Sequence, residues 1–155
     1  MSLEDLLSNF AAQTGLPAEQ VSGQDTVNLV FDDKTGVQIT GAGADDEISF
    51  ASILFQVEGE DNLAAIALMI AQANYDQADL YGAHLAMNEQ GQVVLLRRVP
   101  ARSITHVDFN RVLAEFVDAA AKWSASIAAM AESLQEFDSP GTDSAPGEME
   151  IGMKV

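Results

Sequence analysis

The sequence predicts an α+β fold in which helices pack against a twisted, mainly antiparallel sheet. Three segments carry apolar residues at steps of three and four, the period of an amphipathic helix, and five carry them at steps of two, the period of a strand. Short turns join several of the strand segments, and such hairpins produce antiparallel neighbours. The expected order is helix, strand, strand, strand, helix, strand, strand, helix.

The first helical segment covers residues 2–14. Ser2 can cap its amino end, and Gly15 and Pro17 end it. Its large apolar side chains recur at helical spacing: Leu3, Leu6, Leu7 and Phe10. We therefore expect an amphipathic helix with one buried face.

The second helical segment, residues 63–75, is apolar nearly all round, so it must be covered on more than one side. The sheet of the same chain can cover one side, and a second copy of the chain is the simplest cover for the other. The alternative is a fully buried core helix. The third segment, residues 107–134, carries one continuous stripe that is expected to pack on the sheet: Val112, Phe116, Ala119, Trp123, Ile127, Met130 and Leu134.

Five segments have the pattern of strands: residues 26–32, 37–40, 47–58, 82–87 and 92–99. Turns at 33–36 and 88–91 join two pairs of them into hairpins, and Pro100 closes the last strand. The parity of the apolar residues changes within the third strand, which predicts a bulge near Ala51 and Ser52.

The chain of 155 residues is expected to form one domain, residues 1–136. Residues 41–46 form a glycine-rich connection that is expected to be flexible. Residues 137–155 are expected to be an acidic tail without periodicity that is disordered when alone.

The net charge of −17 on a chain that is 48% apolar excludes several partners. Twenty-four acids against seven bases repel nucleic acids and anionic membranes, and attract basic partners. The longest apolar run, 63–71, is about half of the roughly 20 residues that span a bilayer. The acidic start of the chain does not have the pattern of a secretory signal. The one basic cluster, Arg97, Arg98 and Arg102, is expected to pair with nearby acids.

No pattern of residues points to catalysis or to a cofactor. The absence of cysteine excludes disulfides, cysteine-based zinc sites and thiol nucleophiles. His84 and His106 are the only histidines, and neither has metal-ligand spacing. No serine lies in a nucleophile elbow, and the glycines at 41 and 43 lack the phosphate-binding pattern. We therefore predict no enzyme activity, no metal and no cofactor.

Taken together, the element order, size and acidity resemble the class I type III secretion chaperones, the Tir-chaperone-like family. The closest local match is the small hairpin with a polar turn at residues 81–96. The helix that follows it and the opening helix also fit, so the resemblance covers residues 2–134. The matching residues of the helix after the hairpin are Phe109, Leu113, Phe116, Val117 and Trp123.

The resemblance implies a bacterial, cytoplasmic homodimer that binds the N-terminal region of a secreted effector. The effector segment is expected to stay extended, add strands to sheet edges and place apolar side chains in surface grooves. No nucleotide is hydrolysed by such a chaperone; the separate export ATPase, a further partner that the resemblance suggests, strips the complex.

Two sets of apolar residues are the candidates for these contacts. The candidate effector groove is formed by Leu6, Leu7, Phe10, Leu29, Phe31, Ile39, Phe50 and Phe55. The candidate dimer interface is formed by Ile66, Leu68, Met69, Ile70, Leu85, Met87, Val94 and Leu96. The alternative for each groove residue is that it belongs to the core, since every strand and helix must bury one face.

Two other functions are compatible with the sequence. An acidic immunity-type protein would mask a basic toxin surface with exposed carboxylates, and its binding would weaken steeply with salt. An enzyme of an unrecognised type would need a deep pocket with convergent polar groups, for example around His84.

Overall fold

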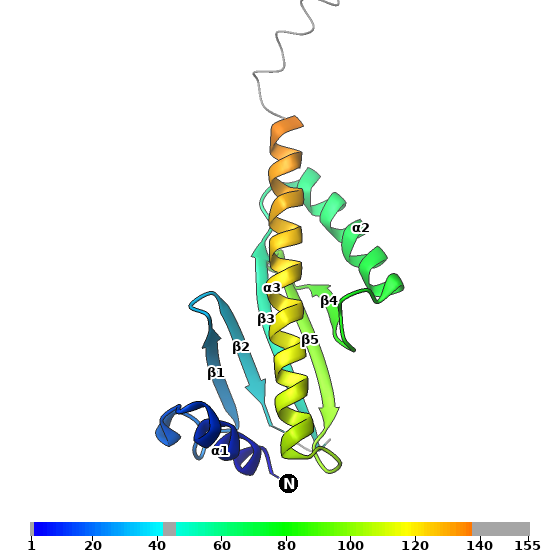
Figure 1. The fold of residues 1–155 in the computed structure, drawn as a ribbon. Coiled ribbons are helices and arrows are strands. Elements are labelled where there is room, and N and C mark those ends of the chain that lie inside the picture. Colours follow the sequence, from blue (N-terminus) through cyan, green and yellow to red (C-terminus); the bar gives the residue numbers. More distant parts are fainter. Residues whose placement is uncertain (1, 42–45, 138–155) are drawn as a thin grey trace, which may run out of the picture.

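The computed structural model describes residues 2–41 and 46–137. Residues 42–45 of the predicted connection and the tail from 138 onward lie outside the described residues. The elements follow one another in the predicted order, with one added short helix (Figure 1). They are α1 (Leu3–Thr14), the 3₁₀-helix η1 (Ala18–Gln20), β1 (Thr26–Phe31), β2 (Thr35–Thr40), β3 (Glu47–Gln56), α2 (Glu60–Asp76), β4 (His84–Met87), β5 (Gln92–Pro100) and α3 (His106–Phe137).

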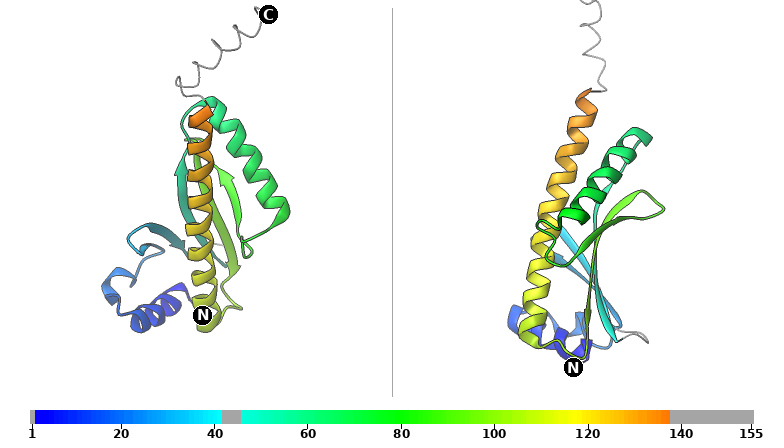
Figure 2. Two further views of the ribbon diagram at one scale, coloured as in Figure 1. Left: turned by 45° about the horizontal axis from the view of Figure 1, so that its top comes forward. Right: turned by 90° about the vertical axis from the view of Figure 1, so that its right-hand side faces the viewer.

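The five strands form one antiparallel sheet in the order β1-β2-β3-β5-β4. The three α-helices pack on one face of this sheet, which we call the inner face, and α3 runs along its length (Figure 2). The other face, called the outer face, carries no helix among the described residues. The α+β class and the antiparallel sheet are therefore confirmed.

The core lies between the inner face and the helices. The ring of Phe50 lies 5.8 Å from those of Phe109 and Phe116, and Phe10 bridges from α1 to Phe109 at 6.4 Å. Residues Val112, Phe116, Ala119 and Ile127 of the predicted α3 stripe are buried, and its other members are half-buried. These contacts confirm that α3 packs on the sheet through that stripe.

The turn of the first hairpin differs from the prediction. The first hairpin turns at Asp32–Lys34, because Asp32 and Asp33 adopt positive φ (53° and 56°) and the N–H of Lys34 already donates to the Phe31 carbonyl. Short acidic side chains tolerate this left-handed backbone. β2 consequently begins at Thr35, within the predicted turn.

The irregularity in β3 lies between Ile53 and Phe55, two residues after its predicted place. Ser52 stays buried on the inner side, and its hydroxyl donates to the Gly36 carbonyl at 2.6 Å. The alternation of burial along β3 continues past Ser52, and the register with β5 shifts only after Ile53.

Candidate partner-binding surfaces

The β4 edge of the sheet is covered at Leu85 by a single side chain of α2. The Asn74 amide donates to the Leu85 carbonyl at 2.8 Å, and the Leu85 N–H donates to the Asn74 side-chain oxygen at 2.8 Å. The asparagine thus makes the two bonds that a neighbouring strand would make. An edge covered in this way does not offer the Leu85 backbone to another chain.

The β1 edge, at the other end of the sheet, is open. The Gly41 N–H donates to the Asp25 carbonyl at 2.8 Å, so the backbone of Asp25 points toward β2. Because these directions alternate along an antiparallel strand, the backbone groups of Thr26, Asn28 and Val30 point away from the sheet. Among the described residues, no side chain hydrogen-bonds to these backbone groups. This edge can therefore accept a further strand.

An open groove of about 510 Å³ runs beside the β1 edge, between that strand and the end of α1. Its apolar walls come from Phe10, Leu16, Leu29 and Phe31. Phe31 lies 6.5 Å from Phe10, ring centre to ring centre, and is only half-buried. A strand paired with β1 would place alternate side chains toward this groove.

A second groove, of about 340 Å³, lies on the outer face where β2 diverges from β3. The ladder between these strands covers only three residue pairs, and beyond them Ser52 bonds to Gly36 in place of a backbone donor. The groove exposes Val30 and Ile53, which are 69% and 62% accessible, together with the half-buried Val94 and Leu96.

The α2 helix is covered by this chain on one side only. Ile66, Ile70 and Ala73 are buried against β4 and its surroundings. The opposite side exposes Leu68 and Tyr75, which are 61% and 88% accessible. This arrangement matches the prediction that the chain's own sheet covers one side of an apolar helix.

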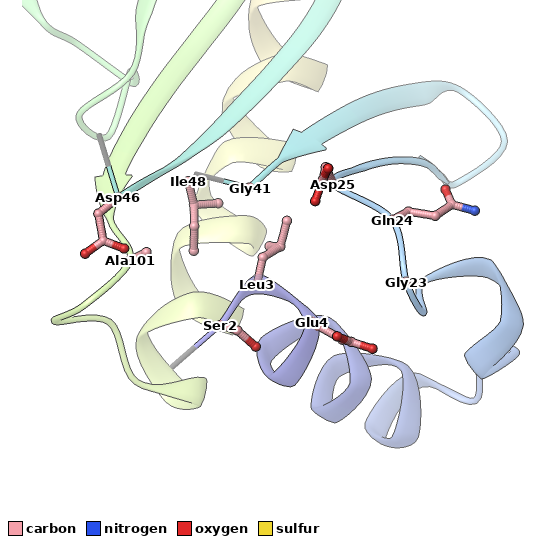
Figure 3. Close-up of a pocket in the computed structure, with 10 residues that line it drawn as sticks. All are labelled: Ser2, Leu3, Glu4, Gly23, Gln24, Asp25, Gly41, Asp46, Ile48 and Ala101. Carbon is pink, nitrogen blue, oxygen red and sulfur yellow. The ribbon is translucent and has the colours of Figure 1, made fainter. Parts of the chain in front are cut away.

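A partly polar hollow of about 420 Å³ lies between the start of α1, the end of β2 and the start of β3 (Figure 3). Glu4, Asp25 and Asp46 belong to its lining, but their carboxylates do not converge on one point (Figure 3). Asp46 forms an ion pair with Arg102. The described residues hold no group of three side chains placed to bind a metal, and His84 is exposed on β4. We find no arrangement here that would support catalysis.

The predicted effector-binding residues divide into two groups. Six are buried in the core of the chain: Leu6, Leu7, Phe10, Leu29, Ile39 and Phe50. Phe31 and Phe55 are half-buried. Of all eight, only Phe10, Leu29 and Phe31 also line the groove beside β1. Leu6, Leu7, Ile39 and Phe50 are removed from solvent because they fill the space between the inner face and the helices.

The predicted dimer residues are similarly divided. Ile66, Ile70 and Leu85 are buried inside the contact between α2 and β4, which leaves no surface for a second copy. Half-buried positions are Met69, Met87, Val94 and Leu96. Leu68 is the exposed member of the set. The exposed Tyr75, two turns further along α2, extends the surface of Leu68; the absence of a polar face in α2 is the sequence signal for it.

Most bases in the described residues are paired with acids. Arg97 donates to Glu115 at 2.9 Å, and this bond holds the pKa of the Glu115 carboxyl below its ordinary value. Lys122 of α3 contacts Asp79 at 2.7 Å, which ties α3 to the connection after α2. The predicted pairing is confirmed for Arg97 and Arg102, whereas the exposed Arg98 has no ion pair within the described part.

Three solved structures share this fold. The ExsC–ExsE complex contains a chain 25% identical to this one, with a TM-score of 0.63, and the match covers 79% of this chain and 90% of that one. The ExoU–SpcU complex from the type III secretion system of Pseudomonas aeruginosa matches at 20% identity and a TM-score of 0.59, over 77% and 95% of the two chains. The Yersinia pestis type III secretion chaperone SycH, in complex with a fragment of YscM2, matches at 16% identity and a TM-score of 0.59, over 77% and 98%.

No curated protein sequence matches the chain. Within the described residues, no helix is long and apolar enough to span a bilayer. The sequence profile of the Tir chaperone protein (CesT) family matches residues 5–124. This match takes in every helix and strand from α1 to most of α3. The chain therefore belongs to the Tir chaperone protein (CesT) family, a family of chaperones and not of enzymes.

Proposed function

We propose that this protein is a type III secretion chaperone that holds the N-terminal segment of a secreted effector in extended form. It acts in the bacterial cytoplasm, keeps the segment soluble and export-competent, and uses no ATP. Family membership supports this function, as does the likeness to chains solved in the ExsC–ExsE and ExoU–SpcU complexes. The export ATPase is the partner proposed to strip the complex.

The observation that carries the proposal is the open β1 edge beside an apolar groove. Backbone bonds to the edge set the register of a bound segment, and apolar pockets select its side chains. One large side chain that is fully buried in the groove contributes roughly 1.5–3 kcal/mol, before the cost of ordering the segment. Several such anchors are therefore needed, and the groove at β1 supplies the first.

A homodimer supplies the others and covers α2. Two copies joined through the side of α2 that carries Leu68 and Tyr75 bury apolar surface that one chain leaves exposed. Such a dimer also presents two β1 edges. An extended segment that reaches both gains anchors without any new type of contact.

The dimer is tested by Leu68→Glu, because a charge in an apolar interface is costly and Leu68 contributes little to the core. Met69 is a poorer choice, since it packs against the core of its own chain. We expect sedimentation to show half the parent mass for Leu68→Glu and the full mass for Val107→Glu, an exposed control on α3. Equal masses for Leu68→Glu and the parent would refute this interface.

The function is tested by purification of the protein from a native bacterial lysate, followed by protease digestion of the complex. We expect one co-purified protein whose N-terminal segment is protected and whose remainder is digested. Protection of a folded domain instead would contradict the proposal.

The net charge of −17 favours a second candidate, an acidic immunity-type protein that masks a basic toxin. The salt dependence of the recovered complex separates the two functions. Binding through apolar grooves survives moderate salt, whereas binding through exposed carboxylates weakens steeply as ions screen them.

A further inference from the structure

The tail contains a pattern that belongs to strands. From Met149 to Val155, apolar residues occupy every second position, and they are separated by Glu150, Gly152 and Lys154. The expectation of a tail without periodicity is therefore wrong for residues 149–155. Strict alternation over this length is typical of a strand with one face on an apolar surface.

The outer-face groove is an apolar surface of matching size. It crosses the sheet through the row of Val30, Ile53 and Val94, and nothing lies within 4 Å of the position that a side chain on Gly36 would take. Exposed apolar side chains that gather in this way usually meet a partner. The groove therefore has room for apolar side chains from another segment.

The length of the tail limits the part of the chain that it can reach. Ser124 of α3 donates to the Leu54 carbonyl at 3.0 Å, which places the Ile53 region level with residue 124. From there to Phe137 the helix rises ~20 Å, and Figure 1 shows this part of α3 extending beyond the end of β3. Residues 138–148 span up to ~36 Å when extended, enough to return around the end of the sheet.

The β1 groove lies beside the outer-face groove, and both are lined by Asn28, Leu29 and Val30. Its far end is at Phe10, whose ring lies 6.4 Å from that of Phe109. From Phe109 to Phe137 the helix rises ~42 Å, so this end lies beyond the ~36 Å reach of residues 138–148. The near end of the β1 groove, at Val30, is within reach, as is the row of Val30, Ile53 and Val94 on the outer face.

Charge favours the outer-face groove. Arg98 pairs across strands with Ser49, two positions along β5 from Leu96 of the groove, and is exposed. It has no ion pair within the described residues, although the chain carries a large excess of acids. Glu148 and Glu150 place negative charge at the start of the alternating segment, and their attraction to Arg98 acts at a distance, without an ion pair.

We propose that residues 149–155 dock as an extended segment on the outer-face groove of their own chain, with Met149, Ile151 and Met153 turned toward Ile53 and Val94. The tail thereby covers an apolar surface that a partner would otherwise meet, and any partner of this groove must displace it. The proposal needs no effector, so its failure and the failure of the proposed function are separate events.

The test is disulfide formation in the full chain, which has no cysteine of its own. In Gly36→Cys/Ile151→Cys, docking brings the two α-carbons within the ~7 Å that a disulfide requires. The parity control is Gly36→Cys/Glu150→Cys, because residue 150 then points away from the sheet. A second control, Ala121→Cys/Ile151→Cys, measures how often the two thiols meet by random motion alone. Residue 121 is exposed on α3, close to the level of Ser124 and Ile53.

We expect an intramolecular disulfide to form at least about tenfold faster in the first variant than in either control, since docking concentrates the two thiols. Equal rates in the three variants would overturn docking, and disulfides found only between two chains would overturn docking on the same chain. Methyl NMR of the full chain gives a measurement without cysteines. Met149→Ser/Ile151→Ser should shift the signals of Ile53 and Val94, and unchanged signals would contradict the proposal.

Discussion

The two edges of the sheet differ in how they treat their free backbone groups. At β4, Asn74 bonds to both the N–H and the C=O of Leu85, and α2 packs alongside. At β1, the outward groups of Asn28 and Val30 meet no side chain of the described residues, and an apolar groove runs beside them. One edge is covered by α2 at Leu85, and the other is open at each outward residue of β1.

This difference explains how one small sheet can be stable and still bind an extended partner. A free edge is a liability because it pairs with any extended chain, so proteins cover the edges that they do not use. Here the cover is specific to one edge. The uncovered edge therefore marks the place where an extended partner is expected.

The largest effect is expected when the closed edge is broken. Asn74→Ala leaves the N–H and C=O of the buried Leu85 without partners, and each buried unsatisfied group costs about 1–3 kcal/mol. Urea denaturation should show the free energy of unfolding reduced by about 2–4 kcal/mol.

The control for this prediction is Gln72→Ala, an exposed change on the same helix, which should alter stability by less than about 0.5 kcal/mol. If Asn74→Ala were as mild as Gln72→Ala, the closure of the β4 edge by this side chain would be refuted.

A smaller effect, on binding alone, is expected when the open edge is blocked. Asn28→Pro removes an N–H that points away from β2, and an edge strand tolerates this change. Titration calorimetry with the effector segment recovered from the lysate should show affinity reduced about tenfold or more, the loss of one or two backbone bonds.

Asn28→Thr is the matched control for the blocked edge, because it alters the same side chain and keeps the N–H. It should bind like the parent. Strand addition at β1 would be excluded if proline and threonine at this position bound the segment equally well.

The smallest effect concerns the ion pair between Arg97 of β5 and Glu115 of α3, which belongs to neither edge strand. The bond from Arg97 lowers the pKa of Glu115, so the folded state binds that proton less readily than the unfolded state does. Its stabilisation is complete above the ordinary pKa of 4.5 and is lost as the pH falls through the lower folded value.

Glu115→Gln should therefore reduce the free energy of unfolding by about 1 kcal/mol at pH 7 and by less at pH 3. Denaturation at both pH values measures the difference. Asp118→Asn, on the same helix and exposed, should change the free energy of unfolding by less than about 0.5 kcal/mol. Similar behaviour of the two variants would mean that the Arg97 bond does not stabilise the fold.

The fold could be predicted because its elements follow local periods. The apolar stripe of α3 and the alternation of the strands can be seen directly in the order of residues. In the structure these apolar residues meet around Phe50, which contacts Phe109 and Phe116 of α3. The displaced bulge could not be predicted in the same way. It is defined by the register of β3 against β5, where Ile53 pairs with Val94 and Phe55 with Val93, and no local pattern contains that pairing.

The candidate surfaces were less predictable than the fold. Leu6 and Phe31 have the same apolar character in the sequence, yet one is buried and the other lies half-exposed beside an open edge. Burial is decided by contacts between distant segments, and periodicity identifies only the apolar face. The role of Asn74 was likewise hidden, because a lone asparagine in a helix acquires meaning only from the strand beside it.

Amide hydrogen exchange of the chaperone, measured residue by residue with and without its bound effector segment, tests the central claim most directly. We expect the N–H groups of Thr26, Asn28 and Val30 to become protected on binding, while that of Leu85, already bonded to Asn74, stays unchanged. Unaltered exchange along β1 in a saturated complex would contradict the account of an open edge that receives the effector.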